Sequence, residues 1–216
     1  MAIANTDWKA FLSPDSDLPT DVCFLLSDGE DKSNIKAIRA HSQILGGVSR
    51  VFRKKFFGMM KDEKEGIEVY DVTVEAFQTL IDFIYRPPGQ DTFTMDNIIY
   101  PEKHFQVLQL ADYYEVLDLK TQVRKALQNF VVRRENLALS ATVAMNNKVI
   151  FEDCSVILSL RCLKFLLDTS AKNPYDMSAV IEDTQNRFPG VSQDILLELK
   201  RVKDEKMPGN IKYCLV

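Results

Sequence analysis

The first third of the chain alternates short apolar runs with polar turns. Residues 21–26 form a short run that is continuously apolar from Val22 and ends at Ser27-Asp28-Gly29, which predicts a strand covered on both faces. A second strand is expected at about 34–40, pairing back across the polar loop, and a third at 66–70, where apolar and polar residues alternate. Between these two strands we expect two short helices, near 41–46 and 49–57.

From Thr73 onwards the apolar spacing changes to that of a helix. Thr73 is a suitable N-cap, and apolar residues follow at helical intervals until Pro87 and Pro88 end the segment. Residues 86–103 are expected to form a long loop with a short strand near 92–95. Two further helices are predicted by the same spacing, in Val107, Leu110, Ala111 and Tyr114 and then in Leu119, Val123, Ala126 and Phe130.

Beyond residue 130 the pattern is helical throughout. Four more helices are expected, at about 134–146, 152–168, 176–187 and 192–205, and Ser192 is the expected N-cap of the last. No internal repeat or low-complexity tract interrupts the pattern. The sequence therefore predicts an α+β unit followed by an all-helical extension.

Composition narrows the possible functions. The 216 residues are 46% hydrophobic and 27% charged, as in ordinary globular proteins, and the formal net charge of −4 argues against a protein that mainly wraps a polyanion. No apolar stretch reaches the roughly 18 residues of a membrane span, and Asp7 and Lys9 interrupt the amino-terminal segment where a signal peptide needs an apolar core. We therefore expect a cytoplasmic or nuclear protein that neither spans a membrane nor is secreted.

The cysteines support the same compartment. Cys23, Cys154, Cys162 and Cys214 form no CxxC pair, and Cys23 and Cys162 stand in apolar runs. They are expected to be buried, reduced thiols, because disulfides are rare in cytosolic and nuclear proteins.

Residues that could carry out catalysis are sparse. The only histidines, His41 and His104, stand near no cysteine pair, so a zinc site is not expected. Ser49 follows two glycines but lacks the second glycine of a GxSxG nucleophile motif, and it is better explained as a helix cap. No phosphate-binding glycine loop follows a strand, and the acidic loop 28–31 lacks EF-hand spacing. We expect no enzyme activity, no metal and no cofactor.

One basic cluster has two possible interpretations. Arg50, Arg53, Lys54 and Lys55 lie in one short predicted helix, and the first three share a face that could meet nucleic acid or an acidic partner. The simpler interpretation is a solvated face opposite Val51, Phe52 and Phe56, which we favour because the chain is acidic.

Several residue groups, in order along the chain, resemble the BTB/POZ domain. They are Asp21-Val22-x-Phe24, Ala40-His41 with Leu45, Ser49-x-Val51-Phe52 with Phe56, Ile67 to Val72, Glu75-Ala76-Phe77 with Phe83-Ile84-Tyr85, and Ala111-Asp112-Tyr113-Tyr114 with Leu117 to Leu119. The resemblance implies a BTB/POZ fold, a small mixed sheet with a helical cluster, over residues 18–129. Residues 130–216 resemble the helical 3-box or short BACK-like region of speckle-type POZ adaptors.

The resemblance implies a protein-interaction module that in many relatives binds the cullin 3 scaffold of a ubiquitin ligase. Those adaptors carry a hydrophobic-x-Glu motif in the loop after the Val-Phe helix, and here Met60-Lys61-Asp62 occupies it, with Asp62 replacing the glutamate. The implied partner-binding residues are Phe57, Met59, Met60, Asp62 and Glu63. In the alternative interpretation, Met59 and Met60 only fill the core beneath the loop.

The resemblance also implies a homodimer. Trp8, Phe11 and Leu12 form an apolar stripe at i, i+3 and i+4, which either contacts a second subunit or caps its own domain; we favour the dimer. Ser42 stands where zinc-finger transcription-factor relatives often have a basic residue, so a similar corepressor pocket is not expected. The main hypothesis is a substrate adaptor, and the alternatives are a homotypic scaffold or a transcription regulator.

Overall fold

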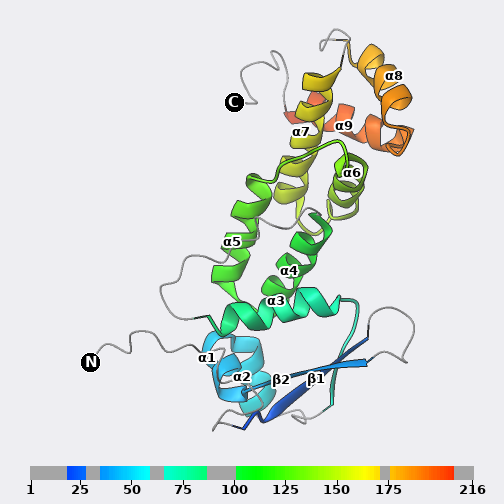
Figure 1. Cartoon of the computed structure of the whole chain (residues 1–216). Coiled ribbons are helices and arrows are strands. Elements are labelled where there is room, and N and C mark those ends of the chain that lie inside the picture. The colour runs from blue at the N-terminus through cyan, green and yellow to red at the C-terminus, as the bar shows by residue number, and fades with distance from the viewer. Residues whose placement is uncertain (1–18, 28–34, 59–65, 87–100, 171–175, 207–216) are drawn as a thin grey trace. The chain divides into compact units, whose positions relative to one another are not determined.

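The structure is a computed structural model, and it describes five parts of the chain: residues 19–27, 35–58, 66–86, 101–170 and 176–206 (Figure 1). In these parts lie three strands and nine helices, so the predicted α+β class is confirmed. The chain forms two compact units. The first contains residues 1–94 and 106–123, and the second contains residues 95–105 and 124–216.

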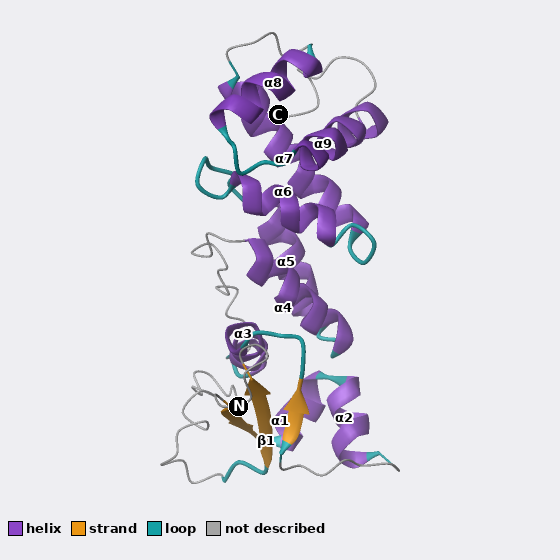
Figure 2. Ribbon diagram, turned by 90° about the vertical axis from the view of Figure 1, so that its right-hand side faces the viewer, coloured by secondary structure: helices purple, strands orange, loops and turns teal. Residues whose placement is uncertain are grey.

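A small mixed sheet forms the amino-terminal part of the first unit. β1 (Val22–Ser27) lies in the middle, antiparallel to β2 (Ile35–Ala40) and parallel to β3 (Ile67–Val69) (Figures 1 and 2). All three strands were predicted, and so was the pairing of the first two. The parallel pairing of β1 with β3 requires the chain to cross over between them, and α1 and α2 form that crossover.

One face of β1 is buried and the other is only half covered. Val22, Phe24 and Leu26 point into the core, whereas Cys23 and Leu25 are partly exposed. The prediction of a strand covered on both faces is therefore wrong, because an apolar run does not reveal how much covers each face. Cys23 is accordingly a half-buried thiol rather than a buried one.

The other described cysteines agree with the prediction. Cys154 and Cys162 are buried, and no disulfide joins the cysteines in the part of the chain that the structure describes. Cys214 and the acidic loop 28–31 lie outside the described residues.

Helices α1 (Ser42–Val48), α2 (Arg50–Phe57) and α3 (Val74–Ile84) belong to the same unit as the sheet. Ser49 ends α1 and caps α2, since its Oγ accepts a hydrogen bond of 3.1 Å from the Phe52 N–H. Thr73 caps α3 in the same way, through the Ala76 N–H. Both caps were predicted, because a hydroxyl side chain directly before an apolar periodic run is a typical helix start.

Aromatic rings fill the core of this unit. The ring of Phe24 from β1 lies within 5.0–6.5 Å of the rings of Phe52, Phe56 and Phe77. Leu45, Leu80 and other fully buried aliphatic side chains complete the core. Aromatic pairs at these distances add to the free energy of burial, so these rings help to hold β1, α2 and α3 together.

Helices α4 (Pro101–Tyr113) and α5 (Leu117–Gln128) follow. The predicted loop 86–103 is too long at its end, since α4 already begins at Pro101. Proline suits the first position of a helix, where no intrahelical partner for an N–H exists. The expected short strand at 92–95 lies outside the described residues.

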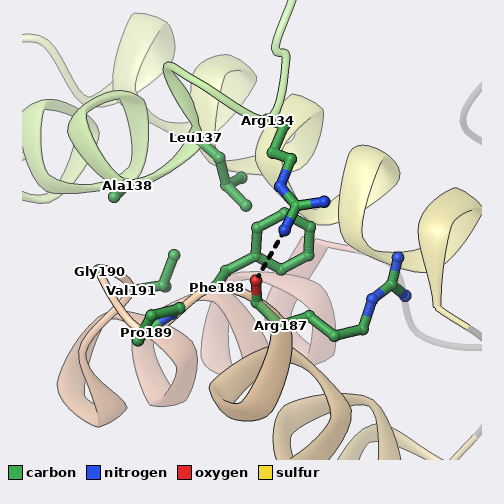
Figure 3. A pocket seen from close by; sticks show the side chains of 8 residues that line it. All are labelled: Arg134, Leu137, Ala138, Arg187, Phe188, Pro189, Gly190 and Val191. Atoms are coloured by element: carbon green, nitrogen blue, oxygen red, sulfur yellow. Dashed lines mark hydrogen bonds between the residues drawn. The ribbon is translucent and has the colours of Figure 1, made fainter.

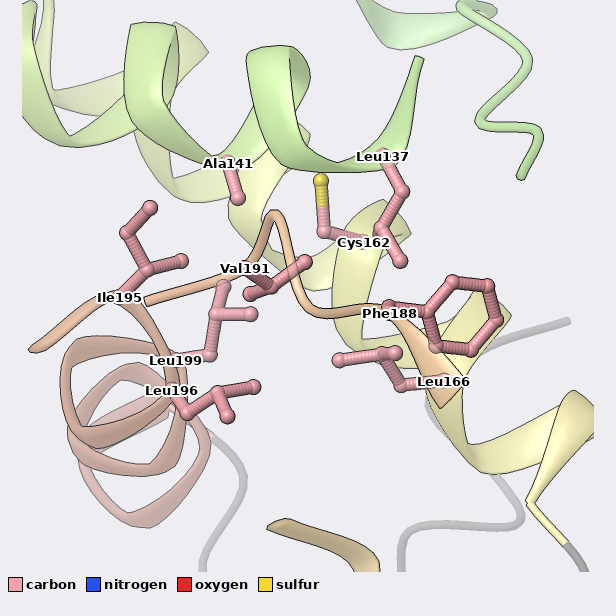
Figure 4. Packing of buried hydrophobic residues seen from close by; sticks show 9 residues of the cluster. All are labelled: Leu137, Ala141, Cys162, Leu166, Phe188, Val191, Ile195, Leu196 and Leu199. Atoms are coloured by element: carbon pink, nitrogen blue, oxygen red, sulfur yellow. The ribbon is translucent and has the colours of Figure 1, made fainter. Parts of the chain in front are cut away.

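The second unit is helical in its described part. It contains α6 (Leu137–Asn146), α7 (Glu152–Thr169), α8 (Met177–Arg187) and α9 (Gln193–Lys206). Their packing centres on one cluster of buried side chains (Figure 4): Leu137, Ala141, Cys162, Leu166, Phe188, Val191, Ile195, Leu196 and Leu199. The predicted N-cap of α9 is confirmed by a 3.4 Å hydrogen bond from the Ile195 N–H to Ser192 Oγ.

The predicted start of α6 at residue 134 is wrong by three residues. Asn136 is buried and its side chain bonds backward, accepting from the Arg133 N–H at 2.7 Å and donating to the Val131 carbonyl at 3.2 Å. These bonds tie Asn136 back to residues 131–133, and residues 134–136 form a turn instead of helix, since an asparagine side chain competes with helical backbone bonds. Among the described helices, none is long and apolar enough to cross a membrane.

Candidate functional site

The structure describes only part of the predicted interaction surface. Phe57 is the last residue of α2, whereas Met59, Met60, Asp62 and Glu63 lie outside the described residues. The same holds for Trp8, Phe11 and Leu12, which were expected at a dimer interface. The end of α2, with Phe57, is the described part nearest in sequence to residues 59–63.

Phe57 presents half of its ring to solvent on a fixed support. Its residue surface is 51% exposed, and its ring makes an edge-to-face contact with Phe56. The other side of the ring lies over Gly46 of α1, where an added Cβ would come within 3.1 Å of Phe57 Cε2 and 3.3 Å of Arg53 Cα. The absence of a side chain at Gly46 therefore lets α1 and α2 approach closely and leaves room for the Phe57 ring against α1.

From Phe57 a row of rings runs through the core to a second exposed aromatic residue. Phe56 stacks on Phe52 at 5.7 Å, and Phe52 stacks on Tyr114 at 4.2 Å. Tyr114 then contacts Tyr113 edge to face at 4.9 Å. Tyr113 is 69% exposed, so the row begins and ends at the surface. We call these five residues the aromatic row.

Tyr113 was not among the predicted site residues. The helical spacing that identified the inner face of α4 includes Tyr114 and leaves Tyr113 outside it. The location of Tyr113 on the outer face of the predicted helix could have identified it, because a large aromatic residue on such a face is a common interface residue. Its connection to Phe57 depends on tertiary packing.

Two polar contacts beside the aromatic row fix α2 to the turn between α4 and α5. Ser49 Oγ donates a buried hydrogen bond of 2.5 Å to the Tyr114 carbonyl. Arg50 Nε donates to Glu115 Oε2 at 2.8 Å as part of an exposed ion pair. Burial raises the pKa of the Tyr114 hydroxyl well above its ordinary value, so this buried ring of the row stays neutral.

Structural contacts also occupy much of the basic cluster. Arg50 pairs with Glu115, and Arg53 Nε donates to the Gly46 carbonyl at 2.8 Å, at the end of α1. Lys54 and Lys55 lie in the last turn of α2, where positive charge interacts favourably with the helix dipole. These contacts agree with the interpretation of a solvated structural face.

Two polar pairs secure the junction of β2 and α1. The His41 N–H donates to the Tyr85 hydroxyl at 2.7 Å, and the same hydroxyl lies 2.8 Å from His41 Nδ1. Ser42 donates from its N–H and its Oγ to the Asp21 carboxylate, at 2.7 and 2.6 Å. Burial raises the pKa of Tyr85 to about 12. His41 and Ser42 are thus structural residues, both buried.

The feature that stands out in the described part of the first unit is a supported pair of exposed aromatic rings, Phe57 and Tyr113. Single exposed apolar residues are common on protein surfaces. Phe57 and Tyr113 differ because each is the end of a packed row. Rigid exposed aromatic residues suit contact with another protein, since they bury a large area at a low entropic cost.

Comparison with known proteins agrees with a role in contacts with other proteins. The chain is 31% identical over 94 residues to the BTB and MATH domain-containing protein 42 of Caenorhabditis elegans; the matched part is 43% of this chain and 22% of that protein. A family model of the BTB/POZ domain, a protein-interaction module, matches residues 13–130. The similarity of residues 130–216 to a 3-box or BACK region stays a prediction. Because the match covers more than half of the 216 residues, the chain belongs to the BTB/POZ domain family.

Proposed function

We propose that this protein is a noncatalytic substrate adaptor of a cullin 3-type ubiquitin ligase, acting in the cytoplasm or nucleus, and that it forms a homodimer through its BTB domain. In this proposal residues 18–129 are the BTB/POZ domain, and residues 130–216 are a 3-box or BACK-like region that extends it. The observation that carries the proposal is the position of Phe57. Phe57 is half exposed, its ring lies over Gly46, and only Gly58 separates it from the segment Met59-Met60-Lys61-Asp62-Glu63.

The proposed cullin contact combines apolar and acidic groups. Phe57 supplies a rigid aromatic anchor, and Met60 inserts into an apolar pocket of the partner. Asp62 or Glu63 accepts hydrogen bonds at the rim of that pocket. Ser49 and Arg50 support the contact indirectly, because they hold α2 against the α4–α5 turn.

Isothermal titration calorimetry against the amino-terminal half of cullin 3 tests the proposal. The wild-type chain should release or absorb heat with a saturable profile, and Phe57→Ala, Met60→Ala and Asp62→Ala should each weaken binding by about tenfold or more. Tyr70→Ala is a matched control, because Tyr70 is 63% exposed and lies outside the aromatic row. Absence of binding by the wild-type chain would remove the cullin proposal.

Light scattering tests the homodimer separately. The wild-type chain should have twice the mass of one chain, and Trp8→Ala combined with Phe11→Ala should lower it, because the stripe of Trp8, Phe11 and Leu12 is proposed to contact the second subunit. Trp8 is the only tryptophan, so its fluorescence in the wild-type chain reports on dissociation when the protein is diluted. An oligomer that binds no cullin would favour the alternative function, a homotypic scaffold.

A further inference from the structure

A small pocket in the second unit lies where α6 begins and α8 ends (Figure 3). Its volume is about 260 Å³. It is lined by Arg134, Leu137, Ala138, Arg187, Phe188, Pro189, Gly190 and Val191. Residues from two separate parts of the chain therefore form one depression, with apolar groups and two guanidinium groups around it.

The two arginines differ in how their charges are compensated. Arg187 Nη1 donates to Asp183 Oδ2 at 3.2 Å and also to the Thr169 carbonyl, so this cation has a carboxylate partner. Among the described residues, the one hydrogen bond that the Arg134 side chain donates runs from Nη2 to the Arg187 carbonyl, at 3.4 Å. No carboxylate forms an ion pair with Arg134 in the parts of the chain that the structure covers. Most of its N–H donors are therefore available to a ligand.

The ring of Phe188 orients both cations. The guanidinium carbon of Arg134 lies 5.3 Å from the ring centroid, and that of Arg187 lies 5.5 Å from it. Phe188 is itself buried, since it belongs to the cluster that packs α6, α7 and α9 together. Arg134 is thus an exposed cation held by a rigid aromatic support.

The size and lining of the pocket limit what it can accept. Its volume is below the range of about 300–1,000 Å³ typical of pockets for whole small molecules. Leu137, Ala138 and Val191 give it apolar walls, which suit one or two apolar side chains. The available guanidinium at its edge matches the two oxygens of a carboxylate. Phosphate-binding sites commonly use clusters of arginines. Of the two arginines that line this pocket, Arg187 is paired with Asp183, which leaves Arg134 to bind a carboxylate.

We propose that this pocket is a docking site for a short peptide segment of another protein, in which an apolar side chain stands within three residues of an aspartate or glutamate. The apolar side chain would contact Leu137, Ala138 and Val191, and the carboxylate would form a bidentate pair with Arg134. The inference does not depend on cullin binding. It assigns a second, chemically different contact surface to the helical extension.

Fluorescence anisotropy with a defined peptide set tests the proposal on the full chain. Each fluorescein-labelled peptide has glycine-serine flanks and carries Leu, Phe or Val with Asp or Glu one to three residues before or after it; each is paired with its Asn or Gln counterpart. At least one acidic peptide should bind, and its amide counterpart should bind about tenfold more weakly or worse. Arg134→Glu should abolish binding, and Ala138→Leu, which narrows the pocket, should weaken it.

The controls separate the pocket from general charge effects. Arg133→Glu makes the same charge change at the neighbouring exposed position, outside the pocket lining, and should leave binding unchanged. Arg134→Gln provides a milder variant should the charge reversal lower stability. The proposal is overturned if no acidic peptide binds at about 1 mM, if the amide peptides bind equally well, or if Arg133→Glu is as damaging as Arg134→Glu. It is also overturned if Arg134→Glu instead dissociates an oligomer, because the occupant would then be a second copy.

Discussion

Ser49 Oγ donates a hydrogen bond to the Tyr114 carbonyl while accepting one from the Phe52 N–H. One buried hydroxyl therefore joins the start of α2 to the end of α4, across 65 positions of sequence. The cap is local, and the bond to Tyr114 is tertiary.

We predict that Ser49→Ala lowers the free energy of unfolding by about 2–4 kcal/mol. The change removes a helix cap, which contributes about 1 kcal/mol, and leaves the buried Tyr114 carbonyl without this donor, at a cost of about 1–3 kcal/mol. Ser192→Ala removes only an exposed cap and should cost about 1 kcal/mol or less. Urea unfolding measures the loss of unfolding free energy in each variant. Equal losses at the two positions would contradict the tertiary role of Ser49.

Glu115 provides a second prediction, because its φ angle is 53°. It ends α4 in a Schellman turn, in which the Val116 N–H bonds the Ala111 carbonyl and the Glu115 N–H bonds the Asp112 carbonyl. Glycine adopts this left-handed conformation without steric cost. Glu115→Gly should therefore be more stable than Glu115→Ala by about 1 kcal/mol, although both lose the ion pair with Arg50.

The matched control for this prediction is Gln109, an exposed residue inside α4. There the order should reverse, and Gln109→Gly should be less stable than Gln109→Ala by about 1 kcal/mol. Thermal or urea unfolding of the four variants measures both differences in stability. The same order at both positions would show that the backbone conformation of Glu115 is not left-handed.

A third prediction concerns alkaline pH. Burial raises the pKa of Tyr85 from its ordinary 10.0 to about 12, so between these values the folded state retains a proton that the unfolded state releases. The contribution of Tyr85 to stability is complete below pH 10 and is lost as the pH rises towards 12. Tyr85→Phe should lower stability at pH 7, since the hydroxyl accepts from the His41 N–H.

The decisive measurement is the slope of unfolding free energy against pH from 9 to 11. It should be less negative in Tyr85→Phe than in the wild-type chain, by up to about 1.4 kcal/mol per pH unit. Tyr113→Phe serves as the control, because Tyr113 is largely exposed. Identical slopes for the wild-type chain and Tyr85→Phe would contradict the prediction.

The cysteines should react in an order set by burial. Burial raises the pKa of Cys154 to about 11, with Asp153 contributing, and that of Cys162 to about 12. Alkylation requires the thiolate, so Cys23, which is half-buried, should be modified by iodoacetamide at pH 8 well before the other two. Peptide mass spectrometry at successive times measures how fast each of these cysteines is alkylated. In urea the three rates should converge, and early native modification of Cys162 would contradict the assignment.

Local patterns in the sequence were sufficient for most of the fold. Ser49, Thr73 and Ser192 were identified as caps because the signal is a hydroxyl immediately before an apolar periodic run. Pro101 was assigned to a loop, although proline is also favoured at the first position of a helix. The exposure of Cys23 was missed because an apolar run does not show what covers each of its faces.

The candidate sites were harder to predict, because their residues are distant in sequence. Phe57 was selected through a resemblance, whereas its connection to Tyr113 requires ring contacts between α2 and the end of α4. The pocket at Arg134 needs a contact across 53 positions, from Arg134 to Arg187. Helical periodicity assigns inner and outer faces, but it does not show which faces meet.

The contact between Gly46 and Phe57 also has a consequence for evolution. A methyl group at residue 46 would lie 3.1 Å from the Phe57 ring and 3.3 Å from the Arg53 backbone. The side chains that are acceptable at positions 46 and 57 therefore depend on each other. Descendants of this sequence that acquire a bulkier residue at 46 are expected to carry a smaller one at 57, and the first substitution to arise should be the loss of the ring.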